Sequence, residues 1–302
     1  MGGSSGFYGY GSLNIQAKMA SSASNAEASQ REIEINEFLE GLLKEFNKRD
    51  VEAIQTHLSE IEKVLSREIE GLDKILFGGS VSKNTFIEGT SDVDALVFLD
   101  PSKYKEIKPK ELQKAFADLL KKRFPNTIIE KGTLAVTLKF SDYEIQLLPA
   151  LRSNGKVKIA NRDNTDWSAP INTSAFTQRL TKVNQANSNK VVPVIKLAKN
   201  LFEKLPKDCK LSGYHVEALA VEAFAAYNGR YTLYDMTKHL LEHASRRVLN
   251  PITDVTGQSG VVDDYLGASK SLIRQKAARY IGDIHNRFSS SVVSVVSNDL
   301  FT

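Results

Sequence analysis

The chain has 302 residues, of which 41% are hydrophobic and 25% are charged, a composition typical of one large globular domain or two closely packed ones. The formal net charge of +4 does not by itself indicate a nucleic-acid-binding protein, because a basic cleft for a polyphosphate fits it equally well. The single cysteine, Cys209, excludes an intrachain disulfide and a cysteine zinc site. No apolar run is long enough to cross a membrane and no signal peptide is evident, so we expect a soluble cytoplasmic protein.

The N-terminal part of the sequence predicts two helices. Residues 1–26 are rich in Gly, Ser and Ala and are expected to be disordered or loosely docked. Apolar residues at helical spacing then predict a helix over residues 27–48. Asp50 resembles an N-cap, and a second helix is expected from there to about Gly71. Together the two helices would form a long spine for the domain.

The pattern after these helices is that of a mixed α/β region. Residues 95–99 form a continuous apolar run, as a strand buried on both faces would. Residues 109–123 predict a helix that begins with a proline in its first turn, where no N–H is needed. Residues 133–140 alternate in polarity and are followed, after a short turn, by residues 144–148, which predicts a hairpin.

The sequence after Pro149 has mainly helical patterns. The predicted helical segments cover residues 174–187, 192–205, 212–227 and 269–288, with a weaker one over residues 231–249. The chain therefore predicts a mixed N-terminal half and a helical C-terminal half.

Two carboxylates at the start of the predicted strand indicate metal chemistry. Asp92 and Asp94 are two residues apart, a spacing that points both side chains to one face of a strand. Neighbouring carboxylates repel each other unless a cation lies between them, and such oxygen ligands suit magnesium above all, with manganese as the alternative. Two such ions about 4 Å apart would activate an attacking hydroxyl and stabilise a leaving pyrophosphate.

A glycine-rich turn precedes these carboxylates. Gly79 would let the backbone approach a phosphate closely, Ser80 adds a hydroxyl donor, and Lys83 offers charge nearby. Each feature alone is common in turns and at solvated strand edges. Their order and spacing, with an apolar strand after Asp94, favour a catalytic nucleotide site.

The order of these residues resembles a known signature. Gly79-Ser80 followed by Asp92-x-Asp94 resembles the polymerase-beta-like nucleotidyltransferase superfamily. Residues 145–150, 195–199 and 211–217 resemble segments of the cyclic GMP-AMP synthase-like enzymes, and the chain is similar to the bacterial CD-NTases over about residues 72–288.

The resemblance implies an α+β fold, with a polymerase-beta-like core, a mixed sheet and a C-terminal helical domain. We expect an N-terminal segment over residues 1–26, a catalytic core with its spine helices over residues 27–150, and a mainly helical domain over residues 151–302 that completes the nucleotide cleft.

The resemblance also implies an activity and further site residues. A CD-NTase uses magnesium to join NTPs into a cyclic or linear oligonucleotide signal in bacterial anti-phage defence, so a regulatory partner or an effector protein is expected. Lys199 would reach the triphosphate and Tyr214 would stack on the base, roles that suit a mobile point charge and an aromatic face. Relatives often carry a phosphate-binding serine where this chain has Gly213, and the adjacent Ser212 is the candidate to replace it.

The sequence departs from the family pattern at Gln146, where relatives carry the third metal-binding Asp. Three alternatives follow: Glu144, on the same strand face, supplies the missing charge; Gln146 serves as a neutral ligand; or the enzyme is inactive, naturally or by design. The first is favoured, and both residues are therefore candidates for the catalytic set.

Two other functions remain open beside the active synthase. A nucleotide-binding sensor or subunit without catalysis would explain Gln146. A polymerase that adds nucleotides to nucleic-acid ends is less favoured, because the chain has no obvious nucleic-acid module and no long basic stripe.

Overall fold

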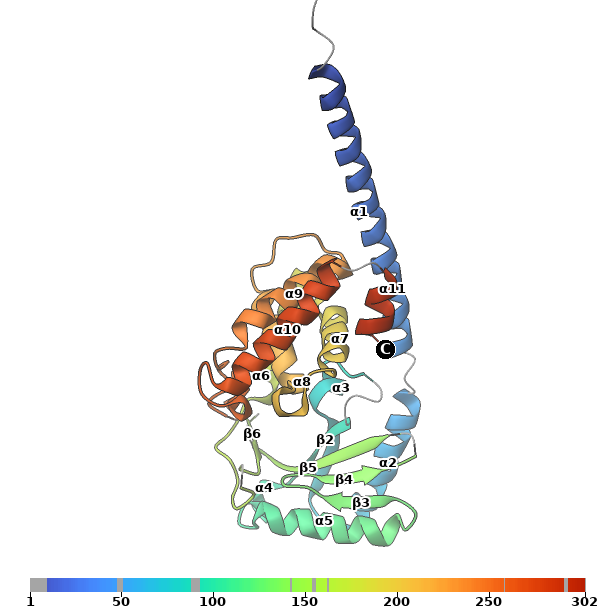
Figure 1. The fold of residues 1–302 in the computed structure, drawn as a ribbon. Helices are drawn as coiled ribbons and strands as arrows, with labels where there is room; N and C mark the ends of the chain where they lie inside the picture. Colours follow the sequence, from blue (N-terminus) through green and yellow to red (C-terminus); the bar gives the residue numbers. More distant parts are fainter. Residues whose placement is uncertain are drawn as a thin grey trace, which may run out of the picture.

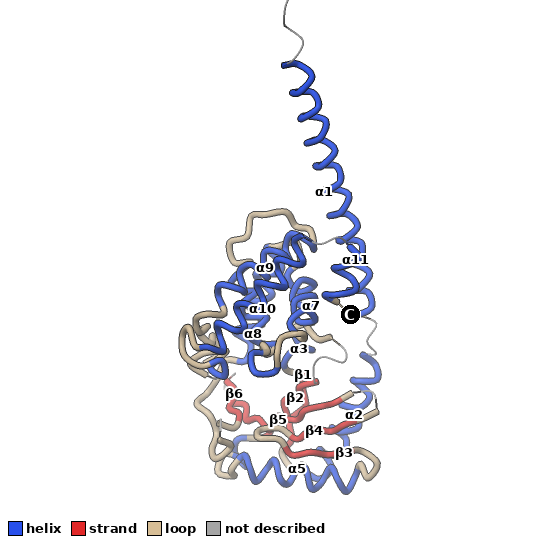
Figure 2. The backbone as a smooth tube through the Cα atoms, viewed as in Figure 1, coloured by secondary structure: helices blue, strands red, loops and turns tan. Residues whose placement is uncertain are grey.

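A mixed sheet lies at one end of the molecule and a group of helices at the other in this computed structural model (Figures 1 and 2). The structure describes residues 10–47, 51–87, 93–141, 143–153, 156–161, 163–257, 259–290 and 293–301. The predicted N-cap Asp50 and the predicted metal ligand Asp92 lie outside these residues.

The described strands form one six-stranded sheet around its longest member, β5. The strands are β1 (Leu72–Phe77), β2 (Val93–Leu99), β3 (Ile128–Lys131), β4 (Val136–Lys139), β5 (Glu144–Ser153) and β6 (Lys156–Ile159). Strand β5 pairs in parallel with β2 and antiparallel with β4 and β6. The predicted hairpin is therefore confirmed as β4 and β5, whereas β3 and β6 were not predicted.

The two faces of β2 have different surroundings. Val93, Ala95 and Val97 are buried in a core that also contains side chains of helices α2 (Val51–Glu68) and α5 (Pro109–Arg123). On the other face Asp94 and Leu96 are only partly covered. Within the run 95–99, which was predicted to be buried on both faces, Leu96 is therefore an exception, because a cavity adjoins it.

Helix α5 begins and ends where the sequence predicted. Pro109 occupies its first turn, and Leu112, Phe116 and Leu120 face the core at spacings of four residues. In Figure 1 this helix runs along the outer side of the sheet.

The helices at the other end surround a second core. They are α6 (Thr173–Ala186), α7 (Val191–Phe202), α8 (Gly213–Ala223), α9 (Leu233–Arg247) and α10 (Leu272–Ser290). Short elements complete the described part: α3 (Gly79–Ser82), α4 (Pro101–Tyr104), α11 (Val293–Val295), η1 (Lys207–Cys209), η2 (Asp264–Leu266) and η3 (Val296–Leu300). These helices confirm the predicted helical C-terminal half, to which the short strand β6 is an exception.

The two predicted spine helices belong to different cores. Helix α1 (Tyr10–Phe46) places Ile35, Leu39 and Leu43 in the core of the C-terminal helices. Helix α2 places its own apolar stripe, which includes Ile61, against the sheet. The division of the chain near residue 150 remains a prediction, since α1 packs with elements that follow it.

Helix α1 extends further toward the N-terminus than the sequence predicted. It begins at Tyr10, whereas the sequence predicted a helix only from residue 27. Alanine recurs at every third position over residues 17–26 and no proline interrupts them, which favours a helix. In Figure 1 this half of α1 projects away from the body of the protein. None of the helices that the structure describes is long and apolar enough to cross a membrane.

Candidate active site

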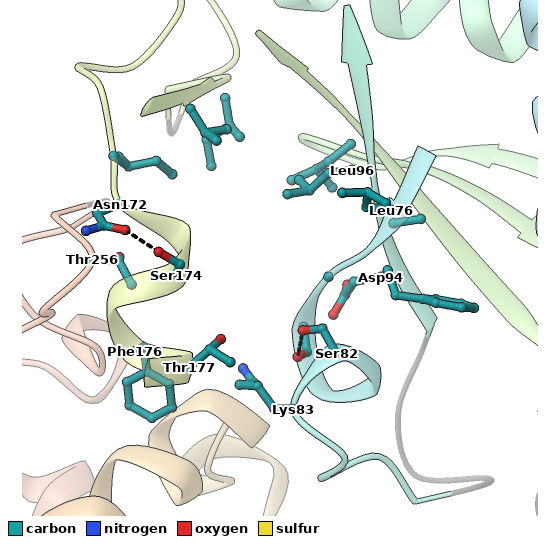
Figure 3. A pocket seen from close by; sticks show the side chains of 18 of the residues that line it. Leu76, Ser82, Lys83, Asp94, Leu96, Asn172, Ser174, Phe176, Thr177 and Thr256 are labelled. Atoms are coloured by element: carbon teal, nitrogen blue, oxygen red, sulfur yellow. Dashed lines mark hydrogen bonds between the residues drawn. The ribbon is translucent and has the colours of Figure 1, made fainter. Parts of the chain in front are cut away.

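A cavity of about 550 Å³ lies beside the glycine-rich turn, between the sheet and the C-terminal helices (Figure 3). Asp94 and Ser82 occupy one wall, and Ser174 and Thr177 of α6 occupy the opposite wall. The sheet supplies an apolar surface made of Leu96, Phe98, Leu148, Val157 and Ile159. A cavity of this size, mostly apolar and with a few polar groups, is suited to a small organic ligand such as a nucleotide.

The glycine-rich turn packs directly against Asp94. The Gly78 N–H donates a hydrogen bond to the Asp94 carbonyl oxygen at 2.8 Å. Gly79 has a φ of +49°, and a Cβ at this position would stand only 1.8 Å from Asp94 Oδ2. A glycine is therefore required here so that the carboxylate can lie against the backbone. Gly79 was predicted as a site residue for its approach to phosphate, and that role remains a prediction.

Gln146 lies next to Asp94 on the neighbouring strand. The parallel pairing of β2 with β5 sets Asp94 opposite Gln146, so both side chains emerge on the same face of the sheet. Glu144 is also on this face by alternation, but its side chain is 46% exposed and its carboxylate is 3.9 Å from Lys139 Nζ. Of the two candidates for the missing ligand, Gln146 is therefore the residue that the strand register places beside Asp94.

The donors around Asp94 fit a hard divalent cation. No three His, Cys, Asp or Glu side chains converge as metal ligands in the described part of the chain. The described residues offer the Asp94 carboxylate and the Gln146 amide on adjacent strands, and magnesium prefers such oxygen ligands. The second predicted carboxylate, Asp92, lies outside the described residues.

The two predicted phosphate-binding lysines meet at one buried carboxylate, that of Glu217 on α8. Lys199 Nζ lies 2.9 Å from Glu217 Oε1, and Lys83 Nζ lies 2.7 Å from Oε2. Burial by itself raises the pKa of Glu217, but the two lysines outweigh this effect and the pKa is lowered. Burial lowers the pKa of Lys199 despite the attraction of Glu217. Lys83 lines the cavity, whereas Lys199 lies behind it.

Tyr214 lines the cavity and is held at both ends of its side chain. Its hydroxyl donates a hydrogen bond to Asp254 Oδ1 at 2.9 Å, and its ring meets the Phe176 ring edge-on at 4.7 Å. Burial and the hydrogen bond to Asp254 raise the pKa of Tyr214, so the hydroxyl remains a donor. Asp254 also accepts hydrogen bonds from Thr256 and Ser259, which fixes the loop beside the cavity.

Ser80 and Ser212 make local contacts and do not belong to the residues that line the cavity. The Ser80 carbonyl accepts a hydrogen bond from the Thr85 N–H at 2.9 Å. Ser212 is the N-cap of α8, where its hydroxyl accepts from the His215 N–H at 3.2 Å. Their predicted contacts with phosphate remain predictions.

The sequence analysis missed several residues that line the cavity or contact its lining side chains. Glu217 lies one helical turn after Tyr214 and has apolar neighbours on both sides in α8, and a carboxylate among such neighbours was the available signal. Phe176, Asp254 and Thr256 carry no comparable signal, because only the packing of α6 and the 254–259 loop against α8 brings them to the cavity.

His215, next to Tyr214 on α8, makes the stability of this region depend on pH. The Tyr265 hydroxyl accepts a hydrogen bond from the Ser212 N–H and lies 3.1 Å from His215 Nδ1, while His215 Nε2 lies 3.4 Å from Asp263 Oδ2. A neutral imidazole with its proton on Nε2 suits both contacts, because that proton then faces the carboxylate. Burial, assisted by Arg274 and Arg247 and opposed by Asp263, lowers the pKa of His215 from 6.5 to about 4. The folded protein therefore holds this imidazole neutral at pH values where the unfolded chain already binds a proton.

We expect the free energy of unfolding to decrease as the pH falls from about 6.5 to about 4, with a total loss on the order of 3 kcal/mol from His215. Urea denaturation at a series of pH values measures this loss. His215→Gln has no titrating group at this position and should flatten the pH dependence in that window. An unchanged slope in the variant would contradict the assignment to His215.

The described site places a glycine-rich turn against a strand carboxylate, beside a cavity between the sheet and the C-terminal helices. Residues 32–184 match the Second Messenger Oligonucleotide or Dinucleotide Synthetase domain, and the chain belongs to this family. This confirms the prediction that the chain is a member of the CD-NTase family, which is a family of nucleotidyltransferases.

Solved structures of the same fold cover most of the chain at low sequence identity. The Vibrio cholerae cyclic AMP-GMP synthase DncV, solved with a linear intermediate, has a TM-score of 0.62 and 14% identity over 93% of this chain and 91% of its own. CdnC of E. coli MS115-1, solved with a HORMA protein, has a TM-score of 0.62 and 14% identity over 84% of this chain and 88% of its own. CdnG of Bradyrhizobium diazoefficiens, solved with GTP, has a TM-score of 0.61 and 13% identity over 79% of this chain and 85% of its own.

These likenesses support the predicted α+β fold. A comparison with curated protein sequences gives no match.

Proposed function

We propose that this chain binds NTPs in the cavity beside Asp94 and joins them into an oligonucleotide second messenger, with release of pyrophosphate. The observation that carries the proposal is the Asp94 carboxylate, which lies on the wall of a nucleotide-sized cavity against a glycine that leaves room for it. Membership of the second messenger synthetase family supports the same substrate class.

Different residues around the cavity would contact different parts of a bound nucleotide. Lys83 offers a positive charge to the triphosphate on the side where Asp94 and Gln146 would hold magnesium or manganese. The bound cation would favour loss of the proton from the attacking hydroxyl and offset the charge of the pyrophosphate. Tyr214 and Phe176 offer aromatic surface to a base, and the apolar sheet face excludes water from the rest of the cavity.

Gln146 favours a second candidate, a nucleotide-binding sensor that does not catalyse transfer. A neutral amide stands beside Asp94 where the resemblance implies a carboxylate, and Glu144 lies near Lys139 instead. Such a protein would keep the cavity and bind NTPs but would not activate the acceptor hydroxyl.

We extend the proposal to a signal in bacterial anti-phage defence, the role that the resemblance implies, and to a protein partner that regulates synthesis. The E. coli CdnC relative was solved in a complex with a HORMA protein, which supports the proposal of a protein partner. The DncV relative, solved with a linear intermediate, supports stepwise joining of nucleotides.

Incubation of the protein with all four labelled NTPs and magnesium or manganese, followed by separation of the products, tests the proposal. We expect pyrophosphate and a new oligonucleotide. Phosphatase removes the terminal phosphates of a linear product and changes its mobility, whereas a cyclic product has no terminal phosphates and keeps its mobility. NTP binding without any product would support the sensor instead. Transfer only onto an added RNA or DNA end would identify a terminal nucleotidyltransferase.

A further inference from the structure

Helix α8 carries a carboxylate in the interior of the protein. Glu217 is 1% exposed, and its helical neighbours include the buried apolar residues Val216, Ala218 and Leu219. An ionised carboxylate in such surroundings is costly unless several partners compensate it. The partners of Glu217 therefore show what the carboxylate does in the fold.

Three partners of Glu217 come from two elements outside α8. Lys199 of α7 lies at one carboxylate oxygen and Lys83, at the end of α3, lies at the other, at 2.9 and 2.7 Å. The Thr85 hydroxyl donates a hydrogen bond to the oxygen that faces Lys199, and the Thr85 carbonyl accepts from Lys199 Nζ at 3.0 Å. These contacts fix the orientation of the carboxylate, because each of its oxygens contacts one lysine.

Of the two lysines, only Lys83 reaches the cavity. The Lys83 side chain is 11% exposed and lines the cavity, whereas that of Lys199 is 5% exposed and is not among the lining residues. Lys83 Nζ also lies 5.4 Å from the ring centroids of both Phe176 and Tyr214. Two lysines and one carboxylate leave an excess positive charge, and Lys83 presents it at the cavity wall that also carries Asp94.

We propose that Glu217 is a positioning residue for nucleotide phosphates, which holds the ammonium of Lys83 at the cavity wall and anchors it to Lys199 behind. This inference rests on the proposed function, because it assumes that phosphates enter beside Asp94. Without the carboxylate, the two ammonium groups would repel each other across a buried space, and Lys83 would leave the position from which it faces the cavity.

Inorganic triphosphate is the appropriate probe, since it contains the phosphates without a base. We expect Glu217→Gln to weaken triphosphate binding by about 10–100-fold, the scale of losing a hydrogen bond to a charged group, and to weaken NTP binding to a similar extent. Glu217→Asp keeps the charge and should recover part of the affinity. The matched control is Glu222→Gln, which removes another carboxylate of α8. Glu222 lies outside the set of cavity-lining residues, and its Oε2 is 2.6 Å from Arg247 Nε.

Isothermal titration with each variant, together with its melting temperature, decides the proposal. A folded Glu217→Gln that binds triphosphate as tightly as the unmodified chain would overturn it, as would an equal loss in Glu222→Gln. If Glu217→Gln does not fold, the same decision rests on Glu217→Asp, whose triphosphate affinity must be reduced while that of Glu222→Gln is retained. An unmodified chain that binds neither triphosphate nor NTP would instead refute the proposed function.

Discussion

Replacement of Asp94 by asparagine is expected to lower nucleotidyl transfer by at least about 10²–10³-fold, the scale of losing one preorganised electrostatic contact in an active site. Asparagine keeps the size of the side chain, so the close approach of Gly79 to this position is preserved. It removes the negative charge that would hold the cation beside Gln146. Steady-state turnover with labelled NTPs and magnesium measures the effect.

The control for this prediction is Asp118→Asn, an exposed aspartate on α5 at the outer side of the sheet. It makes the same chemical change away from the cavity and should leave turnover within about twofold, as surface substitutions are usually mild. Circular dichroism should show both variants folded. Full activity in Asp94→Asn would place the catalytic centre elsewhere in the protein.

The elements that the sequence predicted well are those with a strong local pattern. Helix α5 has a proline at its start and an apolar stripe with a period of four residues, and both ends agree with the structure. Strand β6 has only four residues and alternates lysine with apolar side chains, so its pattern is too short to be distinguished from a loop. Its pairing with β5 stabilises it, and that pairing is a long-range property of the fold.

The same distinction applies to the site. Gly79, Lys83 and Asp94 are close in the sequence, and the structure brings them to one cavity wall as their spacing suggested. Glu217 comes from a distant helix and could not be assigned a role before its contacts with Lys83 and Lys199 were known. The resemblance implied that Lys199 reaches a phosphate. In the structure its ammonium contacts Glu217 and Thr85, and the contact with phosphate remains a prediction.

The pairing of Asp94 with Gln146 leads to the second large expected effect. Gln146→Asp places a second carboxylate on the adjacent strand, on the same face as Asp94, and so adds negative charge where the cation would bind. If the neutral amide limits catalysis, turnover should rise by about 10²–10³-fold. Glu144→Gln should change turnover little, because Glu144 is 46% exposed and its carboxylate lies 3.9 Å from Lys139.

A measurement of stability tests the same pair of residues without an assay of activity. Two carboxylates on adjacent strands repel each other without a cation, so Gln146→Asp should lower the melting temperature in a chelator. Magnesium should then raise the melting temperature of this variant more than that of the unmodified chain, since ligands that bind the folded state stabilise it. Gln178→Asp, the same substitution at an exposed position of α6, should show neither effect.

The outcomes separate the three alternatives for position 146. If Gln146→Asp greatly raises turnover and Glu144→Gln leaves it unchanged, the present protein is impaired at Gln146 and acts mainly as a nucleotide-binding protein. A loss of activity in Glu144→Gln means that Glu144 supplies the charge, although its carboxylate lies near Lys139. The third outcome is high turnover in the unmodified chain and the same turnover in both variants. It means that Gln146 is a neutral ligand beside Asp94, because its amide oxygen is then sufficient to bind the cation.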